Sequence, residues 1–298
     1  MTVPSPSPAL LLGGRTFPPG RTLVMAIINR TPDSFYPGSR QYADDVAAEA
    51  VDRAVAEGAD LVDVGGVKAG PGAEVDTAEE LRRVVPFIAR TRAAHPGLLI
   101  SVDTWRAKVA EEACAAGADL VNDTWAGYDP RLPEVAAGHG AGLVCSHTGG
   151  AGPRTRPHRA AYGSTPEGVV DDVVAVLRAA AGRAVAAGID PASVLLDPTH
   201  DFGKNTWHGL ALLRRTDAFV ALRHPVLMAL SRKDFIGETL GLDVADRLEG
   251  TLAATAVAAW AGAKVFRSHD VAATRQVLDM VASIRGERPP ARAVRGLA

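Results

Sequence analysis

The chain has 298 residues, of which 47% are hydrophobic and 22% are charged, and its formal net charge is -2. This composition is typical of a folded globular protein and excludes an intrinsically disordered chain. The small net charge gives no broad attraction for nucleic acid or for an anionic membrane surface. We therefore expect a small-molecule function, with neither nucleic acid nor a membrane as a partner.

The two ends of the chain carry no periodic pattern. Residues 1–20 lack the basic and apolar regions of a signal peptide, so we expect them to form a flexible tail. Residues 287–298 are rich in Pro and Arg and are predicted to be a second tail or a late-docking strap. No apolar stretch reaches the roughly 20 residues that cross a bilayer. Cys114 and Cys145 are predicted to be buried free thiols, which fits a cytoplasmic location.

Between residues 21 and 286, short aliphatic runs alternate with longer Ala-rich segments of helical period. Such alternation predicts parallel strands that are covered by helices. About eight repeats favour one domain, a closed (β/α)8 TIM barrel, over an open doubly wound sheet. Several predicted helices end in a glycine just before the next strand, where a left-handed residue is needed. The predicted strands are 23–28, 61–64, 99–102, 120–121, 143–145, 194–196, 226–229 and 264–266.

Each predicted strand is followed by polar or ionisable side chains. In a TIM barrel the carboxyl ends of the strands form the active site. A single Asp or Asn there is usually a helix N-cap. A carboxylate inside the strand exit, as in SVDTW and LLDPT, cannot easily cap a helix, and its burial requires a partner. The set therefore predicts one polar site, from Asn29, Asp63, Asp103, Asn122, Asp197, Lys233, Arg267 and His269.

Six ordered blocks across residues 25–270 resemble the motifs of dihydropteroate synthases. They read MAIINRTPDSF, SVDTWRAKVA, DLVNDT, LLDPTHDFGKN, ALSRKDFIGET and FRSHDV. Within that family the chain resembles a divergent second actinobacterial copy. The resemblance implies a homodimer built on the later helices, a need for Mg²⁺, and a reaction that joins the pterin of 6-hydroxymethyl-7,8-dihydropterin diphosphate to p-aminobenzoate with release of diphosphate.

The resemblance also implies a pterin subsite. Asp197 would accept two parallel hydrogen bonds from the guanidine-like edge of the ring. Asp103 and Asn122 would bond the remaining polar groups, Lys233 would reach the ring carbonyl and nitrogen, and Phe202 would cover the flat ring. The alternative is that the carboxylates form core salt bridges with Lys233.

The resemblance also implies a second subsite, which binds anions. Arg267 and His269 leave the last strand on the same side, so both side chains can point into the mouth of the barrel. The side-chain oxygen of Asn29 can ligate a Mg²⁺ ion that bridges a diphosphate. With Lys233, these residues are the predicted catalytic set, which would stabilise the departing diphosphate. The basic stretch 152–164 could hold a further anion, although such a run is more often a solvated loop.

The loop after the second predicted strand departs from the family pattern. Functional synthases carry a threonine and an arginine where this chain has Ala69 and Gly70. Lys68 could replace the lost charge, but it lies one to two positions away and lacks the planar fork of a guanidinium.

Three further residues also differ from the family pattern. Asp234 stands where a small hydroxyl residue is usual and is expected to repel the amine's carboxylate, unless it is simply a helix N-cap. Asp201 replaces a usual glycine and Thr148 a usual methionine, so we expect both to reshape the pterin pocket and to weaken or redirect pterin binding.

The leading hypothesis is a synthase-type transferase with weak activity or an altered amine acceptor. The rival is an inactive paralogue that binds a pterin-like or sulfone-like ligand. A third interpretation is a methyltetrahydrofolate-dependent methyltransferase. That reaction has no diphosphate leaving group, so Asn29, Arg267 and His269 argue against it.

Overall fold

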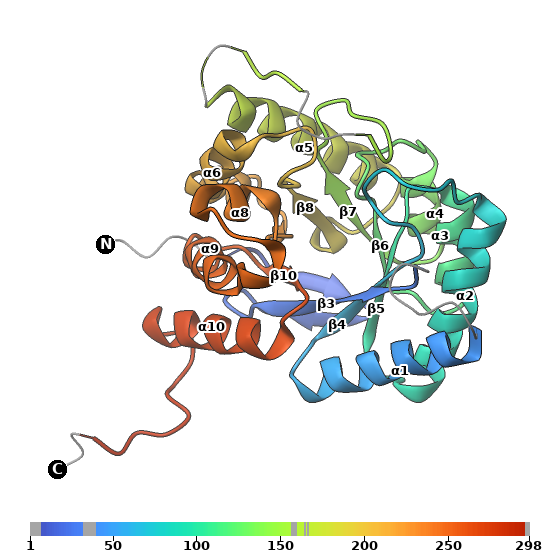
Figure 1. The fold of residues 1–298 in the computed structure, drawn as a ribbon, viewed down its shortest axis with the longest axis horizontal. Helices are drawn as coiled ribbons and strands as arrows, with labels where there is room; N and C mark the ends of the chain where they lie inside the picture. The colour runs from blue at the N-terminus through green and yellow to red at the C-terminus, as the bar shows by residue number, and fades with distance from the viewer. Residues whose placement is uncertain (1–6, 32–39, 156–159, 164, 166, 296–298) are drawn as a thin grey trace.

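The structure, a computed structural model, describes residues 7–31, 40–155, 160–163, 165 and 167–295, with the backbone alone at 40–44. Eight parallel strands form a barrel with helices around it (Figure 1). The sheet order is β8-β7-β6-β5-β4-β3-β10-β9, and a parallel bridge between Leu196 and Val226 joins its two ends. The predicted TIM barrel is confirmed, and each predicted strand is present. The strands are β3 (Leu23–Asn29), β4 (Leu61–Gly65), β5 (Leu99–Asp103), β6 (Leu120–Asn122), β7 (Gly142–Ser146), β8 (Val194–Asp197), β9 (Leu227–Met228) and β10 (Val265–Ser268).

The helices connect successive strands and cover the outside of the barrel (Figure 1). Gly58 and Gly262 end two of them with φ of 95° and 104°, as the pattern before the strands predicts. Among the described residues the α-helices are α1 (Arg40–Ala56), α2 (Thr77–Ala94), α3 (Ala107–Ala115), α4 (Leu132–Gly138), α5 (Gly168–Ala186), α6 (Thr206–Arg214), α7 (Thr216–Val220), α8 (Asp234–Leu240), α9 (Leu248–Trp260) and α10 (Val271–Ile284).

The core has two layers because successive strand residues face opposite sides of the sheet. In β3, Val24 and Ala26 belong to the layer between the strands and the helices. Leu23 and Met25 belong to the layer inside the barrel, together with residues from the beginnings of the other strands. Burial on both faces explains why the strands read as continuous apolar runs.

The N-terminal segment is not the flexible tail that we expected, at least from residue 7 onward. A hairpin of β1 (Leu10–Leu12) and β2 (Arg15–Phe17) turns at Gly13 and Gly14, which both have positive φ. Leu10 and Leu12 are buried inside the barrel layer. We predicted a tail because the Leu run is too short for a signal peptide. The prediction was wrong because the same run is long enough to close the amino end of the barrel. Residues 1–6 lie outside the described part of the chain.

At the other end, residues 287–295 form no helix or strand, and 296–298 are not described. Cys114 and Cys145 are buried and free, as predicted. No helix in the described part of the chain is long and apolar enough to cross a membrane. The cytoplasmic location stays a prediction.

Candidate active site

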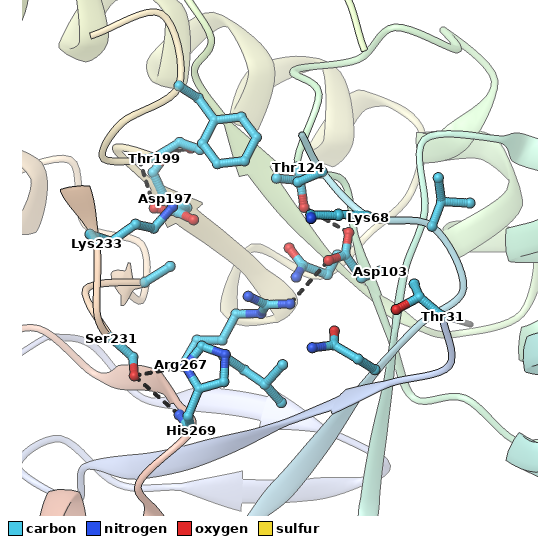
Figure 2. A pocket seen from close by; sticks show the side chains of 17 residues that line it. Thr31, Lys68, Asp103, Thr124, Asp197, Thr199, Ser231, Lys233, Arg267 and His269 are labelled. Atoms are coloured by element: carbon cyan, nitrogen blue, oxygen red, sulfur yellow. Dashed lines mark hydrogen bonds and ion pairs between the residues drawn. The ribbon is translucent and has the colours of Figure 1, made fainter. Parts of the chain in front are cut away.

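The carboxyl ends of the strands surround a cavity of about 390 Å³ (Figure 2). Asp103, Asn122 and Asp197 end β5, β6 and β8, and Arg267 lies on β10. The strands pair in register, so that Gly65 of β4 lies beside Asp103, and Asp103 lies beside Asn122. The structure brings together all the residues that the sequence assigned to binding or catalysis. These are Asn29, Asp103, Asn122, Asp197, Phe202, Lys233, Arg267 and His269.

Arg267 forms the centre of the site by joining two carboxylates. Its Nε donates to Asp63 Oδ2 at 2.6 Å and its Nη2 donates to Asp103 Oδ2 at 3.1 Å. Burial raises the pKa of Asp103 to about 7, the Asp63 carboxylate adds to this rise, and Arg267 opposes it.

Asp63 belongs to the site, as the pattern of strand exits predicted, but the sequence interpretation gave it no role. It has no exposed surface, and besides Arg267 it accepts hydrogen bonds from Ser101 Oγ at 2.6 Å and Asn122 Nδ2 at 3.0 Å. Its only signal in the sequence was its place in the run LVDVGG. The carboxylate orients two pocket residues without lining the cavity itself.

Asp197 and Lys233 face the cavity from neighbouring walls (Figure 2). Asp197 Oδ1 accepts a hydrogen bond from the Thr199 backbone N–H at 2.7 Å. Burial raises the pKa of Asp197, and the charge of Lys233 opposes that rise. Lys233 donates to the His200 carbonyl at 3.0 Å and lies 4.5 Å from the centroid of the Phe202 ring. Among the described residues it forms no salt bridge with either pocket aspartate, which argues against the alternative of core ion pairs.

The loop from Thr199 to Lys204 carries Phe202 into the cavity. Thr199 and Asp201 adopt positive φ of 53° and 71°, which is unfavourable for residues other than glycine. Buried Lys204 offsets this cost, since its ammonium donates to the carbonyls of His147, Thr199 and Phe202 at 2.8–2.9 Å. The sequence interpretation gave Lys204 no role.

Asp201 does not line the cavity, although we expected it to reshape the pterin pocket. Its carboxylate turns to the beginning of α8 and accepts hydrogen bonds from the backbone N–H groups of Asp234 and Phe235 at 2.6 and 3.2 Å. The left-handed backbone at this glycine-like position aims the side chain at the helix.

Asp234 and Thr148 also lie outside the cavity, so that the expected repulsion of the amine by Asp234 stays a prediction. Asp234 is the first residue of α8, not its N-cap, and its largely exposed carboxylate pairs with Arg247 at 2.8 Å. Thr148 lines a separate cavity behind the β7 loop and donates to the Ala151 carbonyl at 3.1 Å. Neither residue lines the candidate site, because each is held by a partner outside it.

The predicted anion end consists of Asn29, Arg267 and His269, which all line the cavity. Ser231 lies beside His269 (Figure 2). Ser231 Oγ lies 3.0 Å from His269 Nδ1 and accepts from the His269 backbone N–H at 3.2 Å. Burial, followed by the charge of Arg267, lowers the pKa of His269 to about 4. His269 is therefore a neutral hydrogen-bonding group at neutral pH.

No cluster of three or more His, Cys, Asp or Glu in the described chain could hold a metal by itself. Asn29 ends β3 and lines the cavity. One amide oxygen fits Mg²⁺ when a phosphate and waters complete the coordination, since this ion usually takes few protein ligands.

The loop after β4 brings Lys68 and Ala69 to the cavity, whereas Gly70 does not line it. The hydroxyl and guanidinium expected of a functional synthase are therefore absent from this wall. Within the basic stretch, Arg154 bonds this same loop, while residues 156–159 and 164 lie outside the described residues.

Comparison with known proteins places this fold and site in a class. The model of the pterin binding enzyme family matches residues 25–269. A Mycobacterium tuberculosis protein named inactive dihydropteroate synthase 2 is 65% identical over 96% of this chain and 90% of its own length. The dihydropteroate synthase of Bacillus subtilis is 39% identical over 84% of each chain. The chain therefore belongs to the dihydropteroate synthase family of pterin-binding enzymes.

A solved structure agrees with this assignment. The dihydropteroate synthase of Xanthomonas albilineans, solved with 4-aminobenzoic acid, is 38% identical and superposes with a TM-score of 0.83. The match covers 94% of this chain and 98% of that chain.

Proposed function

We propose that this chain binds 6-hydroxymethyl-7,8-dihydropterin diphosphate in the barrel mouth and joins it to p-aminobenzoate weakly or not at all. The observation that carries the proposal is that Asp103, Asn122, Asp197 and Lys233 all line the same cavity. Asp201 and Thr148 do not line this cavity, but the charge of Asp201 acts on Lys233, so weakened pterin binding stays a prediction.

The buried floor suits a flat ring with adjacent donors and acceptors. Asp197 would accept from the exocyclic amine and ring N–H together, because a carboxylate can take two parallel hydrogen bonds. Lys233 and Asn122 would meet the ring carbonyl and nitrogen atoms, and Phe202 would cover one face. Binding of a donor pair at Asp197 favours its ionised form and offsets the cost of burial.

Ionisation at the pterin methylene carbon would expel the diphosphate without a protein nucleophile. Arg267 lies at the anion end, and neutral His269 can donate or accept one hydrogen bond there. Asn29 would hold Mg²⁺, which would neutralise charge on the departing diphosphate when bound. An aromatic amine would then attack the cationic carbon.

Loss of transfer is the expected consequence of the altered wall after β4. Ala69 and Gly70 supply no hydroxyl or guanidinium to order the diphosphate or the amine. The 65% identical relative named inactive supports the rival form of the proposal, a silent paralogue that binds a pterin-like or sulfone-like ligand. The relatives named dihydropteroate synthases favour either form over a methyltetrahydrofolate methyltransferase.

Two measurements test the proposal. Calorimetry with the pterin diphosphate and Mg²⁺ should detect binding, and Asp197→Asn should weaken it by about tenfold or more, since the lost bonds are charge-assisted. Asp171→Asn, at an exposed position on α5, is the control. Absence of binding to the unmodified protein would contradict the proposal.

Turnover separates the two forms. Adding p-aminobenzoate at high protein concentration should give a trace of dihydropteroate by mass spectrometry if transfer is weak. Binding without any product would identify the silent paralogue. Binding of methyltetrahydrofolate in preference to the pterin diphosphate would favour the methyltransferase.

A further inference from the structure

The basic groups at the cavity are unequally available to an incoming anion. Arg267 is shared between Asp63 and Asp103 in two ion pairs. His269, with its pKa lowered to about 4, carries no charge at neutral pH. Lys233 donates to the His200 carbonyl and lies 4.5 Å from the centroid of the Phe202 ring. A diphosphate needs a further cation whose charge is not already balanced.

Lys68 is such a cation. It lines the cavity, is exposed to solvent, and forms no hydrogen bond or ion pair with any residue in the described part of the chain. Figure 2 shows its side chain extending into the site from the wall opposite Lys233. An ammonium with three free donors at the rim of a cavity can meet phosphate oxygens without first breaking a protein contact.

The loop that carries Lys68 is held in place by three arginines from different elements. Arg83 of α2 donates to the Gly66 carbonyl at 2.8 Å, and Arg106, the N-cap of α3, donates to the Val75 carbonyl at 2.6 Å. Arg154, from the loop after β7, donates to the carbonyls of Gly70 and Ala73 at 3.2 and 2.6 Å.

These bonds fix both ends and the middle of the loop. Buried Glu80 in turn pairs with Arg106, which orients that guanidinium. Ordering the loop in advance lowers the entropy lost when a ligand binds. Lys68 therefore projects from a backbone that is already positioned.

We propose that Lys68 binds the phosphate oxygens of a diphosphate ligand, and that the arginine-anchored loop holds it in position to do so. The identity of the ligand rests on the proposed pterin function, whereas the anion site can be tested without it. Lys68 then acts in place of the guanidinium that the loop lacks, as a single point charge without a bidentate geometry.

The test is calorimetry on the full chain with Mg²⁺ and three probes: 6-hydroxymethyl-7,8-dihydropterin, its diphosphate and inorganic pyrophosphate. Lys68→Met should weaken binding of the diphosphate and of pyrophosphate by about tenfold, because a charge-assisted hydrogen bond is lost. The affinity for the uncharged pterin alcohol should not change. Lys68→Arg should restore part of the loss, and Lys108→Met, at an exposed site on α3, should have no effect.

Equal losses for the alcohol and the diphosphate would show a structural role and overturn the inference. So would unchanged pyrophosphate affinity in Lys68→Met, or no pyrophosphate binding to the unmodified protein at millimolar concentration. Pyrophosphate binding that depends on Lys68, without binding of either pterin, would retain the anion site and refute only the pterin function.

Discussion

At the scale of single residues, Asp63 determines how its neighbours face the cavity. Its carboxylate accepts hydrogen bonds from Ser101, Asn122 and Arg267, which come from three different strands. Because Asp63 is fully buried, these partners replace all the water that an ionised carboxylate would otherwise bind. The orientation of Arg267 and Asn122 toward a ligand therefore depends on a residue that no ligand touches.

Removing this carboxylate should destabilise the whole domain. Asp63→Ala is expected to lower the free energy of unfolding by about 3 kcal/mol, since it leaves the Arg267 charge without its most buried partner. Urea denaturation followed by circular dichroism measures the change. Asp217→Ala removes an exposed carboxylate that pairs with Arg215 and should cost less than about 1 kcal/mol. A similar small cost for Asp63→Ala would refute the role assigned to the pair.

Because His200 is buried, we expect the free energy of unfolding to fall in acid. It has no exposed surface, and its ring lies 5.2 Å from that of Phe235. Burial, with the charges of Lys204 and Lys233, lowers its pKa to about 3. Between this value and the unfolded value near 6.5, the unfolded chain binds more protons, so stability falls as the pH falls.

The expected contribution is up to about 1.4 kcal/mol for each pH unit below 6.5. His200→Phe should flatten the decline in the free energy of unfolding between pH 7.5 and pH 5, measured by urea denaturation at each pH. His139→Phe, at an exposed position, serves as the control. An unchanged slope in His200→Phe would show that other groups cause the decline.

At the scale of elements, the β1–β2 hairpin closes the amino end of the barrel. Leu12 is 2% exposed, whereas Leu11 faces the other side and is only partly buried. Leu12→Ala should lower the free energy of unfolding by about 2–4 kcal/mol, because it leaves a cavity among packed side chains. Leu11→Ala is the matched control and should cost clearly less in the same thermal or urea experiment. Equal effects would mean that the hairpin does not pack into the barrel in solution.

The loop from Thr199 to Lys204 shows how an element combines backbone strain with function. Positive φ angles at Thr199 and Asp201 direct one side chain to Asp197 and the other to α8. Lys204 holds the loop closed through three carbonyls. The part of the cavity that carries Asp197 and the beginning of α8 are therefore parts of one connected unit.

At the scale of the whole molecule, α9 and α10 lie side by side on one flank (Figure 1). Val257, Met280 and Ile284 on these helices are 51%, 61% and 60% exposed. Large exposed apolar side chains on two neighbouring helices are typical of a protein interface. This face supports the homodimer that the family resemblance implies, which stays a prediction.

We expect light scattering to give twice the chain mass of 31.0 kDa. Combining Val257→Glu with Met280→Glu should produce the monomer mass, because charges would be buried without partners at the interface. Val185→Glu, on α5, should leave the dimer intact. A monomer in the unmodified protein would refute the prediction.

Much of the architecture could be predicted from local patterns. The aliphatic runs identified each barrel strand, because parallel strands buried on both faces need continuous apolar sequence. The position of Asp103 or Asp197 at a strand end then placed it at the mouth, since parallel strands end at the same edge. The N-terminal hairpin was not predicted because its leucines are buried only by packing against the closed barrel, and the sequence alone does not show that contact.

By itself, the sequence determined the barrel, the family and the identity of the residues around the cavity, because these follow from periodicity and from motifs that are contiguous in the chain. Only the tertiary structure decided which charges are paired and where the divergent side chains point. Asp201 turns to α8, Asp234 to Arg247, and Arg267 to Asp63. These directions depend on backbone angles and on neighbours distant in sequence, whose electrostatic interactions arise only when folding brings them together.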